Sequence, residues 1–265
     1  MPRIPWHRLA GGGGERRWAM LGLAGVVALW EIGHRAYGDF VLPSPLATVL
    51  ALGRLASGGD LWPAVVTTAR DAFSGFLAAT LIGSLLGGLA GRSLSVRAML
   101  QPIATILIGV PAIAWVVLSL LWFGGSGLAA TFSVAVAVGP LVFAAATQGT
   151  RTVDGSLCTM ARAFRVPLGA RIVDVYLPHV LSHLLPALGT ALAMSWKVAV
   201  MAELLSGAGG IGDGLAAARA EVDTAKTMAW VVVVVALLLI VERLLIEPVR
   251  RYFETWRRGL PGEAA

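Results

Sequence analysis

Long apolar runs, from which charged residues are nearly absent, recur along this sequence. Only 14% of the 265 residues are charged and 57% are hydrophobic, whereas about a quarter of the residues in a soluble domain are charged. A water-exposed globule of this size would leave much of that apolar surface in contact with solvent. A helix needs roughly 20 mostly apolar residues to cross a membrane, so the chain has room for about six crossings. We therefore expect an all-α, polytopic membrane protein.

The expected spans divide the chain into four parts. Residues 1–17 form a basic N-terminal tail, 18–64 hold the first helix and an outer connection, 65–246 form the transmembrane core, and 247–265 form a C-terminal tail. The first span is the shortest and carries Glu31 near its end. The spans are drawn at about 18–32, 65–90, 99–123, 128–148, 181–205 and 228–246.

The positions of the basic residues predict the orientation. With the N-terminus in the cytoplasm, fifteen of the 21 lysines and arginines fall on the side expected inside, Arg243 at the inner end of the sixth span and the rest in tails and loops, and Lys197 falls deep within a span. Cytoplasmic loops of membrane proteins carry such an excess of Lys and Arg. Both termini are therefore expected in the cytoplasm, and the net charge of +6 is read as topological and not as a nucleic-acid-binding surface. The five basic residues expected outside are Arg35, Arg54, Arg70, Arg219 and Lys226.

A stripe of small residues follows one face of the second expected span. Gly75, Gly83, Gly87 and Gly91 recur at multiples of four residues, with Ala79 between the first two. Small residues at this spacing let a second helix approach closely in lipid. The stripe therefore predicts helix packing on this face, either within one subunit or between two subunits.

Four residues within or beside the spans are candidates for a translocation pathway: Pro111, Trp115, Lys197 and Glu203. Pro111 interrupts the third span and frees a backbone carbonyl, which is tolerated only against protein or a water-filled cavity. Ionisable groups within spans are costly and usually face protein or water. Lys197 is expected either to attract an anion in a pathway or to reach a carbonyl or the interface. Glu203 is expected either to line an entry vestibule or to make a buried structural hydrogen bond.

No enzyme site stands out in the sequence. There is no phosphate-binding loop of the Walker type, so the chain should not hydrolyse ATP itself, and no hydrolase motif groups its serines, histidines and acids. His179 and His183 are four residues apart, yet we expect no metal site there. The single cysteine, Cys158, cannot form a disulfide within the chain. The glycine-rich stretch 207–214 is expected to form a flexible outer turn.

The connection 151–180 is expected inside and carries a short amphipathic helix. Its apolar residues recur at helical spacing, and Val166-Pro167 should end or kink the helix. Such a helix serves either as a docking surface or as a helix resting on the lipid headgroups. The residues at this spacing are Leu157, Met160, Ala161, Phe164 and Leu168.

Several short motifs occur in a fixed order, spread over about four-fifths of the chain, and together they carry a resemblance to a known family. From about Val41 to Arg258 the sequence resembles the inner-membrane permeases of the nitrate/sulfonate/taurine group of ATP-binding-cassette importers. The motifs are Leu42-Pro43-Ser44-Pro45, Ala69-Arg70 with Gly75-Phe76, Gly109-Val110-Pro111-Ala112, Leu121-Trp122-Phe123-Gly124, Leu177-Pro178, and Ala202-Glu203 leading into Gly209-Gly210-Ile211-Gly212.

The resemblance implies a type I importer permease fold in a cell inner membrane. It further implies a homodimer around a central pathway, an ATPase subunit that binds the ATP on the cytoplasmic side, and a soluble or lipoprotein binding protein outside. The cargo would be a small solute such as nitrate, a sulfonate, taurine, bicarbonate or a vitamin precursor. Two alternatives compete with this reading: a membrane scaffold that moves no cargo, and an ion-driven secondary transporter.

The resemblance also places the family's coupling helix at about 154–178. The family's motif usually has Glu-Ala-Ala and then a glycine, whereas this chain has Thr159-Met160-Ala161 and, at the glycine position, Arg165. Arg165 is therefore hypothesised to contact an acidic residue of the ATPase. The residues expected to couple to the ATPase are Thr159, Met160, Ala161, Arg162, Phe164, Arg165, Leu168 and Gly169.

Overall fold

A computed structural model of the chain describes residues 14–153, 159–161, 163–171 and 177–247. Within these ranges every regular element is a helix and no strand occurs, which confirms the all-α prediction. The helices are α1 (Gly14–Tyr37), α2 (Pro45–Ser57), α3 (Leu61–Arg92), α4 (Leu94–Gly109), α5 (Ala112–Phe123), α6 (Gly127–Arg151), α8 (Leu168–Arg171), α9 (Leu177–Ser206), α10 (Ile211–Ala220), α11 (Thr224–Val241) and the π-helical turn η3 (Glu242–Ile246).

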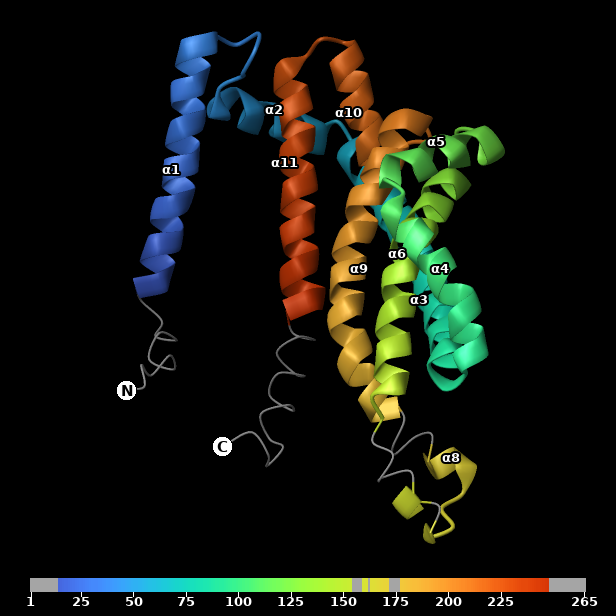
Figure 1. Cartoon of the computed structure of the whole chain (residues 1–265). Helices are drawn as coiled ribbons and strands as arrows, with labels where there is room; N and C mark the ends of the chain where they lie inside the picture. The colour runs from blue at the N-terminus through green and yellow to red at the C-terminus, as the bar shows by residue number, and fades with distance from the viewer. Residues whose placement is uncertain (1–13, 154–158, 162, 172–176, 248–265) are drawn as a thin grey trace.

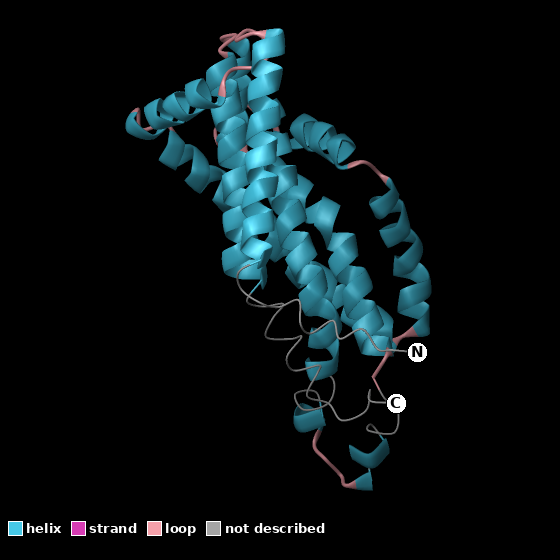
Figure 2. Ribbon diagram, turned by 90° about the vertical axis from the view of Figure 1, so that its left-hand side faces the viewer, coloured by secondary structure: helices cyan, strands magenta, loops and turns pink. Residues whose placement is uncertain are grey.

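The long helices run roughly along one common direction, as Figures 1 and 2 show. In Figure 1 the start of α1 and the end of α11 are the downward-pointing tips of these helices, and the short helix α8 lies further down, on the side that we call the lower end. Helix α2 and the turn between α10 and α11 lie at the top, the upper end. The lower end is therefore the one that carries the stretch expected to face the cytoplasm.

In the described part of the chain, four helices are long and apolar enough to cross a membrane, or up to five if the bent pair α4–α5 counts as one span. The four are α3, α6, His179–Ser206 of α9, and Thr224–Leu244, which covers α11 and the start of η3. The first expected span lies in α1. Its 24 residues give a length of about 36 Å, enough to cross, but Glu31, His34 and Arg35 in its upper turns make it more polar than the other spans.

Helix α6 is the centre of the bundle. None of its residues between Ala129 and Phe143 is exposed, and α3 and α9 both pack against it. The glycine stripe of α3 faces α6: a Cβ atom on Gly83 would lie 2.9 Å from the carbonyl oxygen of Gly139, and one on Gly87 would lie 2.5 Å from that of Phe143. The two backbones are nearly in contact, so this stripe packs within one subunit.

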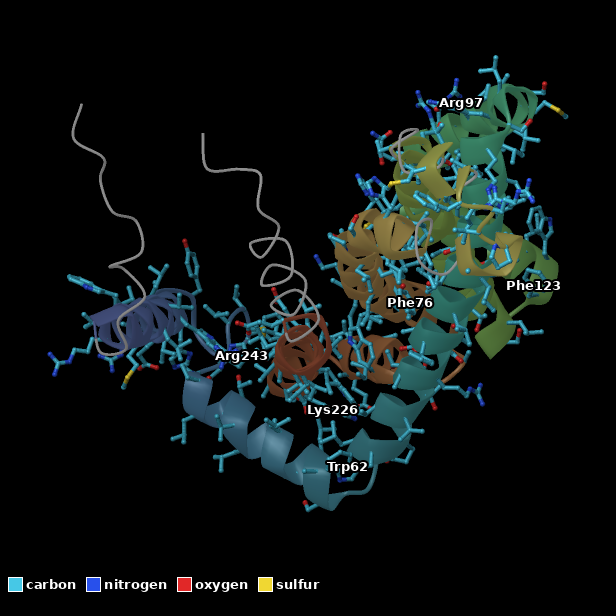
Figure 3. The ribbon with its side chains drawn as sticks, turned by 90° about the horizontal axis from the view of Figure 1, so that it is seen from below. Trp62, Phe76, Arg97, Phe123, Lys226 and Arg243 are labelled. Atoms are coloured by element: carbon cyan, nitrogen blue, oxygen red, sulfur yellow. The ribbon has the colours of Figure 1, made fainter. Side chains whose placement is uncertain are left out.

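Helix α2 begins at the last residue of the Leu42-Pro43-Ser44-Pro45 motif. Ser44 is its N-cap, and its Oγ accepts a 3.1 Å hydrogen bond from the amide of Ala47. Helix α1 is tied to the same corner, because the indole of Trp30 donates to the carbonyl of Pro43 at 2.9 Å. Seen from below in Figure 3, α2 crosses from α1 to the start of α3 at Trp62, and α11 lies between α1 and the α3–α6–α9 bundle.

The third expected span is two helices and not one. Helices α4 and α5 meet at an angle of 97°, and the break lies at Val110 and Pro111, whose backbones are extended. Proline lacks an amide donor and keeps the residue before it out of the helical conformation. Helix α5 is then held against α6 by a 2.8 Å hydrogen bond between the hydroxyls of Ser119 and Ser133.

The expected outer turn at 207–214 is wrong beyond Gly210, because α10 begins at Ile211. A Cβ atom on Gly212 would collide with the carbonyl oxygen of Val200 on α9, and one on Gly214 would lie 2.5 Å from the indole ring of Trp230 on α11. These glycines are helical, and they allow α10 to pack tightly between α9 and α11.

Candidate functional site

One face of α9 is exposed along the whole length of the helix. Exposed residues recur there every three or four positions, the spacing of a single helix face, and we call this set the α9 stripe. It carries two hydroxyls and one ammonium group. The α9 stripe consists of Ser182, Pro186, Thr190, Met194, Lys197, Met201 and Leu205.

The exposed face of α3 has a different chemistry. Between Asp71 and Ala90 every exposed side chain on α3 is a large hydrophobic one, as expected of a surface that meets lipid. These residues are Phe73, Leu77, Leu81, Ile82, Leu85, Leu86 and Leu89. The polar residues of the α9 stripe therefore mark a face that meets water or protein.

Lys197 lies deep within the span. It comes nine residues before Ser206, the last residue of α9, which places its Cα about 14 Å below the upper end of the helix. This position lies inside the candidate span His179–Ser206, in its upper half. Lys197 is exposed, and it forms no ion pair with any residue that the structure describes.

Glu203 lies on the opposite side of α9 and is completely buried, with 0% of its surface exposed. Its Oε2 accepts hydrogen bonds from the hydroxyl of Thr68 at 2.7 Å and from the amide of Gly212 at 3.0 Å. The hydroxyl of Thr68 in turn accepts from the amide of Ile211 at 2.9 Å. Three helices, α3, α9 and α10, meet in this network, which we call the upper polar network.

The upper polar network caps α10 with side chains from other helices. The N-cap residue of α10, Gly210, provides no side-chain hydrogen bond, so the first amides of the helix rely on Thr68 and Glu203. A carboxylate at a helix N-terminus also complements the helix dipole. Gly210 has φ +93°, and a Cβ atom there would collide with the carboxylate of Glu203, so only glycine suits this position.

Sequence reasoning did not single out Asp71, which is 2% exposed on α3. Its Oδ1 lies 3.3 Å from Nε of Arg70, and its Oδ2 has no hydrogen-bond partner among the described residues. A Cβ atom on Gly127 would lie within 3.2 Å of both carboxylate oxygens. The carboxylate therefore sits at the N-terminus of α6. The sequence signal that could have revealed Asp71 is an acid inside an apolar run, three residues after Thr68 on the same helix face.

The other two pathway candidates lie at the α4–α5 bend and just after it. Pro111 is exposed at the bend, and Trp115 is half-buried one turn further along α5. The indole nitrogen of Trp115 is buried without a hydrogen-bond partner among the described residues. The structure of this single subunit therefore leaves Pro111 and Lys197 exposed, Trp115 partly covered and Glu203 enclosed.

The lower end carries the expected coupling region, of which 154–158, Arg162 and 172–176 lie outside the described residues. Thr159, Met160, Ala161 and Ala163 are helical, and Phe164 and Arg165 form the turn that follows. Met160 and Phe164 are 52% and 78% exposed. Leu168 and Gly169 open the four-residue helix α8.

Arg165 ends this helical turn in the left-handed conformation, with φ +50°. The amide of Val166 donates to the carbonyl of Ala161 at 2.9 Å, the bond that closes a Schellman C-cap. Glycine is the usual residue at such a position because it has no Cβ atom to clash. Arg165 therefore stands, in conformation as well as in sequence, where a glycine is expected.

His179 and His183 stack near the lower end of α9, with ring centroids 5.6 Å apart. Within the described part of the chain no group of three or more His, Cys, Asp or Glu residues could hold a metal ion. The hydrogen bonds of His183 run to Ser182 and to the carbonyl of His179.

The sequence is similar to a known protein family and to permease proteins of known transport systems. Residues 79–259 match the family model described as binding-protein-dependent transport system inner membrane component. SsuC of Bacillus subtilis (strain 168), a permease protein named for aliphatic sulfonates transport, is 29% identical over 210 residues, which are 78% of this chain and 76% of that protein. The bicarbonate transport system permease protein CmpB of Synechococcus elongatus is 30% identical over 207 residues, 73% of each chain.

A solved structure shares the fold. The MetNI methionine ABC transporter, in an inward-facing conformation, aligns with a TM-score of 0.61 over 71% of this chain and 94% of the compared chain, at 19% sequence identity. The similarity of fold extends over nearly the whole of that permease chain. The arrangement of α3 to α11 described above is therefore the type I importer arrangement.

Proposed function

This chain belongs to the family of inner membrane components of binding-protein-dependent transport systems and is a permease subunit of an ATP-binding-cassette importer, and we propose that its α9 stripe lines the pathway of a small anionic solute. Because the chain belongs to this family, the two alternative functions, a membrane scaffold and an ion-driven secondary transporter, are set aside. The chain itself is not an enzyme. The ATP is bound by a separate partner subunit, and the cargo is delivered by a solute-binding protein.

The observation that carries the pathway proposal is the exposure of Lys197 well inside the candidate span His179–Ser206. A charged side chain in the middle of a span faces a bundle interior or a water-filled cavity. The exposed face of α3 is apolar, so lipid is expected to lie against that face and not against the α9 stripe. Pro111 and Trp115 lie at the break of the α4–α5 pair, where an irregular backbone needs protein or water beside it. Glu203 supports the wall of the pathway from behind and does not touch the solute.

A homodimer follows from the same exposure. In a single subunit the α9 stripe would meet lipid, which the ammonium group of Lys197 disfavours. A second copy facing the same stripe encloses it and creates a water-filled path between two equal surfaces, the usual closed symmetry of such assemblies. The outer surfaces of α1 and α3 then meet the membrane lipid.

The lower end is proposed to face the cytoplasm, with both termini, and to bind the ATPase. Met160 and Phe164 are large, exposed and apolar, and side chains of this kind anchor protein interfaces. Arg165 adds a positive charge beside them, and it is proposed to contact an acidic residue of the ATPase. An Arg165→Glu variant that bound the ATPase as tightly as the parent would end this idea.

The first experiment is a mild-detergent purification of the tagged permease with its natural partners, read by mass spectrometry. An ATPase subunit copurifying at about one per permease, in a particle with two permeases, supports the proposal. Reconstituted in liposomes, that complex should hydrolyse ATP faster when the loaded binding protein is present. A permease dimer that brings down no ATPase, or a complex whose ATP hydrolysis ignores the binding protein, would contradict it.

A further inference from the structure

Helix α4 buries none of its own residues within a single subunit, although each of the four candidate spans buries part of its surface. It touches its own subunit through α3 and α6. In Figure 3, where Arg97 marks the first turns of α4, the helix lies at the edge of the bundle away from α1. The outer side of α4 is therefore open to whatever lies beside the subunit in the membrane.

One side of α4 carries small and polar groups, which we call the α4 face. Successive residues of a helix are about 100° apart, so five of the exposed residues of α4 fall within an arc of about 100°. Met99 and Ile103 are exposed too, but they point well outside this arc. An open groove runs along the same side and is lined by Ala98, Gln101, Pro102, Thr105 and Ile106. The α4 face consists of Ala98, Gln101, Pro102, Thr105 and Gly109.

Two polar groups on the α4 face are poorly suited to lipid. The carboxamide of Gln101 is exposed and makes no hydrogen bond with any residue that the structure describes. Pro102 has no amide hydrogen, so the carbonyl of Ala98, four residues earlier, loses its helical partner. Gln101 lies about 11 Å along the helix from its first residue, inside the broken span α4–α5. Unpaired polar groups are costly in hydrocarbon, so this face calls for a protein neighbour.

We propose that the α4 face packs against the α4 face of a second copy of this chain, and that Gln101 closes the contact. This inference rests on the proposed function, which supplies the second copy. A two-fold axis along the membrane normal brings identical residues to the same depth, and each contact then occurs twice. A carboxamide has two donor hydrogens. Gln101 can therefore donate to the freed carbonyl of the partner's Ala98, and the partner's Gln101 can donate in return.

The rim of the α4 face distinguishes a protein contact from a water-lined wall. Ile106 and Ile108 border the face on its two sides and are 66% and 60% exposed. Small residues with a few polar groups are typical of helix contacts in membranes, whereas the α9 stripe carries an ammonium group. Because α4 and α9 both pack against α6, a seam along α4 would close the pathway against lipid on this side.

Disulfide cross-linking in the full importer, in native membranes and with Cys158→Ser to remove the native thiol, tests the contact. Ala98→Cys and Thr105→Cys probe the α4 face. The controls are Ile103→Cys, exposed on another side of the same helix, and Leu85→Cys on the apolar face of α3. A membrane-permeant oxidant is added and the covalent permease dimer is quantified. A disulfide needs Cα atoms within about 7 Å of each other, so the dimer yield should be at least about tenfold higher for the two probes than for the two controls.

Gln101→Leu, added to the Ala98→Cys protein, removes the carboxamide and keeps a side chain of similar size. The dimer yield should fall at least about threefold, the effect of one interhelical hydrogen bond of average strength in a membrane. An unchanged yield would overturn the role of Gln101 in the contact.

Two differently tagged copies of the permease, expressed together, separate the possible failures. If the copies copurify and Ala98→Cys and Thr105→Cys give no more dimer than Ile103→Cys, lipid, water or another protein covers the α4 face. That result would overturn the inference and leave the homodimer in place. If the copies do not copurify, the homodimer of the proposed function fails, and the inference fails with it.

Discussion

The carboxylate of Glu203 on α9 and the hydroxyl of Thr68 on α3 are joined by a 2.7 Å hydrogen bond between residues that lie 135 positions apart in the sequence. Glu203→Ala would leave this hydroxyl and the amide of Gly212 without their shared acceptor. Removing one partner of a buried hydrogen bond costs about 1–3 kcal/mol. The purified complex should therefore melt several degrees lower, as measured by thermal unfolding in detergent.

Glu203→Gln is the conservative partner of this test, since an amide oxygen can still accept from Thr68 and Gly212. It should recover most of the lost stability. Glu221→Ala, at an exposed ion pair with Lys226, is the surface control, because such pairs contribute only about 0–1 kcal/mol. A Glu203→Ala protein as stable as the Glu221→Ala protein would show that the network does not hold the helices together.

Neighbouring glycines of α3 provide a matched pair of substitutions. A Cβ atom on Gly87 would lie 2.5 Å from the carbonyl oxygen of Phe143 and 2.7 Å from Cβ of Ala146, whereas Gly88 has nothing within 4 Å. Gly87→Ala should destabilise the α3–α6 contact by about 1–3 kcal/mol. Gly88→Ala should be neutral or stabilising by up to about 1 kcal/mol, because alanine is the better helix former. Chemical unfolding of the two variants side by side checks the difference, and equal effects would refute the close contact.

Arg165→Gly should stabilise the lower-end turn, because glycine adopts the left-handed conformation without the clash of a Cβ atom. The expected gain is about 1 kcal/mol, which corresponds to roughly fivefold slower hydrogen exchange at the amide of Val166 if that amide exchanges by local opening. Arg165→Ala is the control, since it removes the charge but keeps the Cβ atom. Exchange that is no slower with glycine than with alanine would contradict the assignment.

Phe164→Ala should weaken binding of the ATPase subunit and leave the permease fold intact, because the ring is 78% exposed. Anchoring aromatic residues contribute about 2 kcal/mol or more to an interface, so the dissociation constant should rise at least about thirtyfold. Titration of the labelled ATPase into permease in nanodiscs measures it. Val41→Ala at the upper end is the control, and a Phe164→Ala protein that binds as tightly as that control would rule out the anchor.

Much of the fold could be predicted because apolar run length and loop charge act locally. The runs around α3, α6, α9 and α11 are simply long enough to cross. The angle at Pro111 could not be predicted, since proline only breaks a helix. The direction in which α5 leaves depends on the contact between Ser119 and Ser133, two residues on different helices.

The partners of Glu203 were harder to predict, because they lie on other helices. The sequence showed Glu203 beside a glycine-rich stretch, and either a vestibule or a structural hydrogen bond was consistent with that. Its real partners, Thr68 and the amide of Gly212, become visible only once α3 and α10 are placed. Helix α10 itself was missed because two glycines in its first turns cost about 1 kcal/mol each. Capping from other helices and close packing outweigh that local cost.

The upper polar network has a mechanical consequence. Because Thr68, Glu203 and the first amides of α10 share one set of buried hydrogen bonds, the upper ends of α3, α9 and α10 move as a single rigid block. Displacing the upper end of α9 alone would therefore break the hydrogen bonds of Glu203 to Thr68 and to the amide of Gly212.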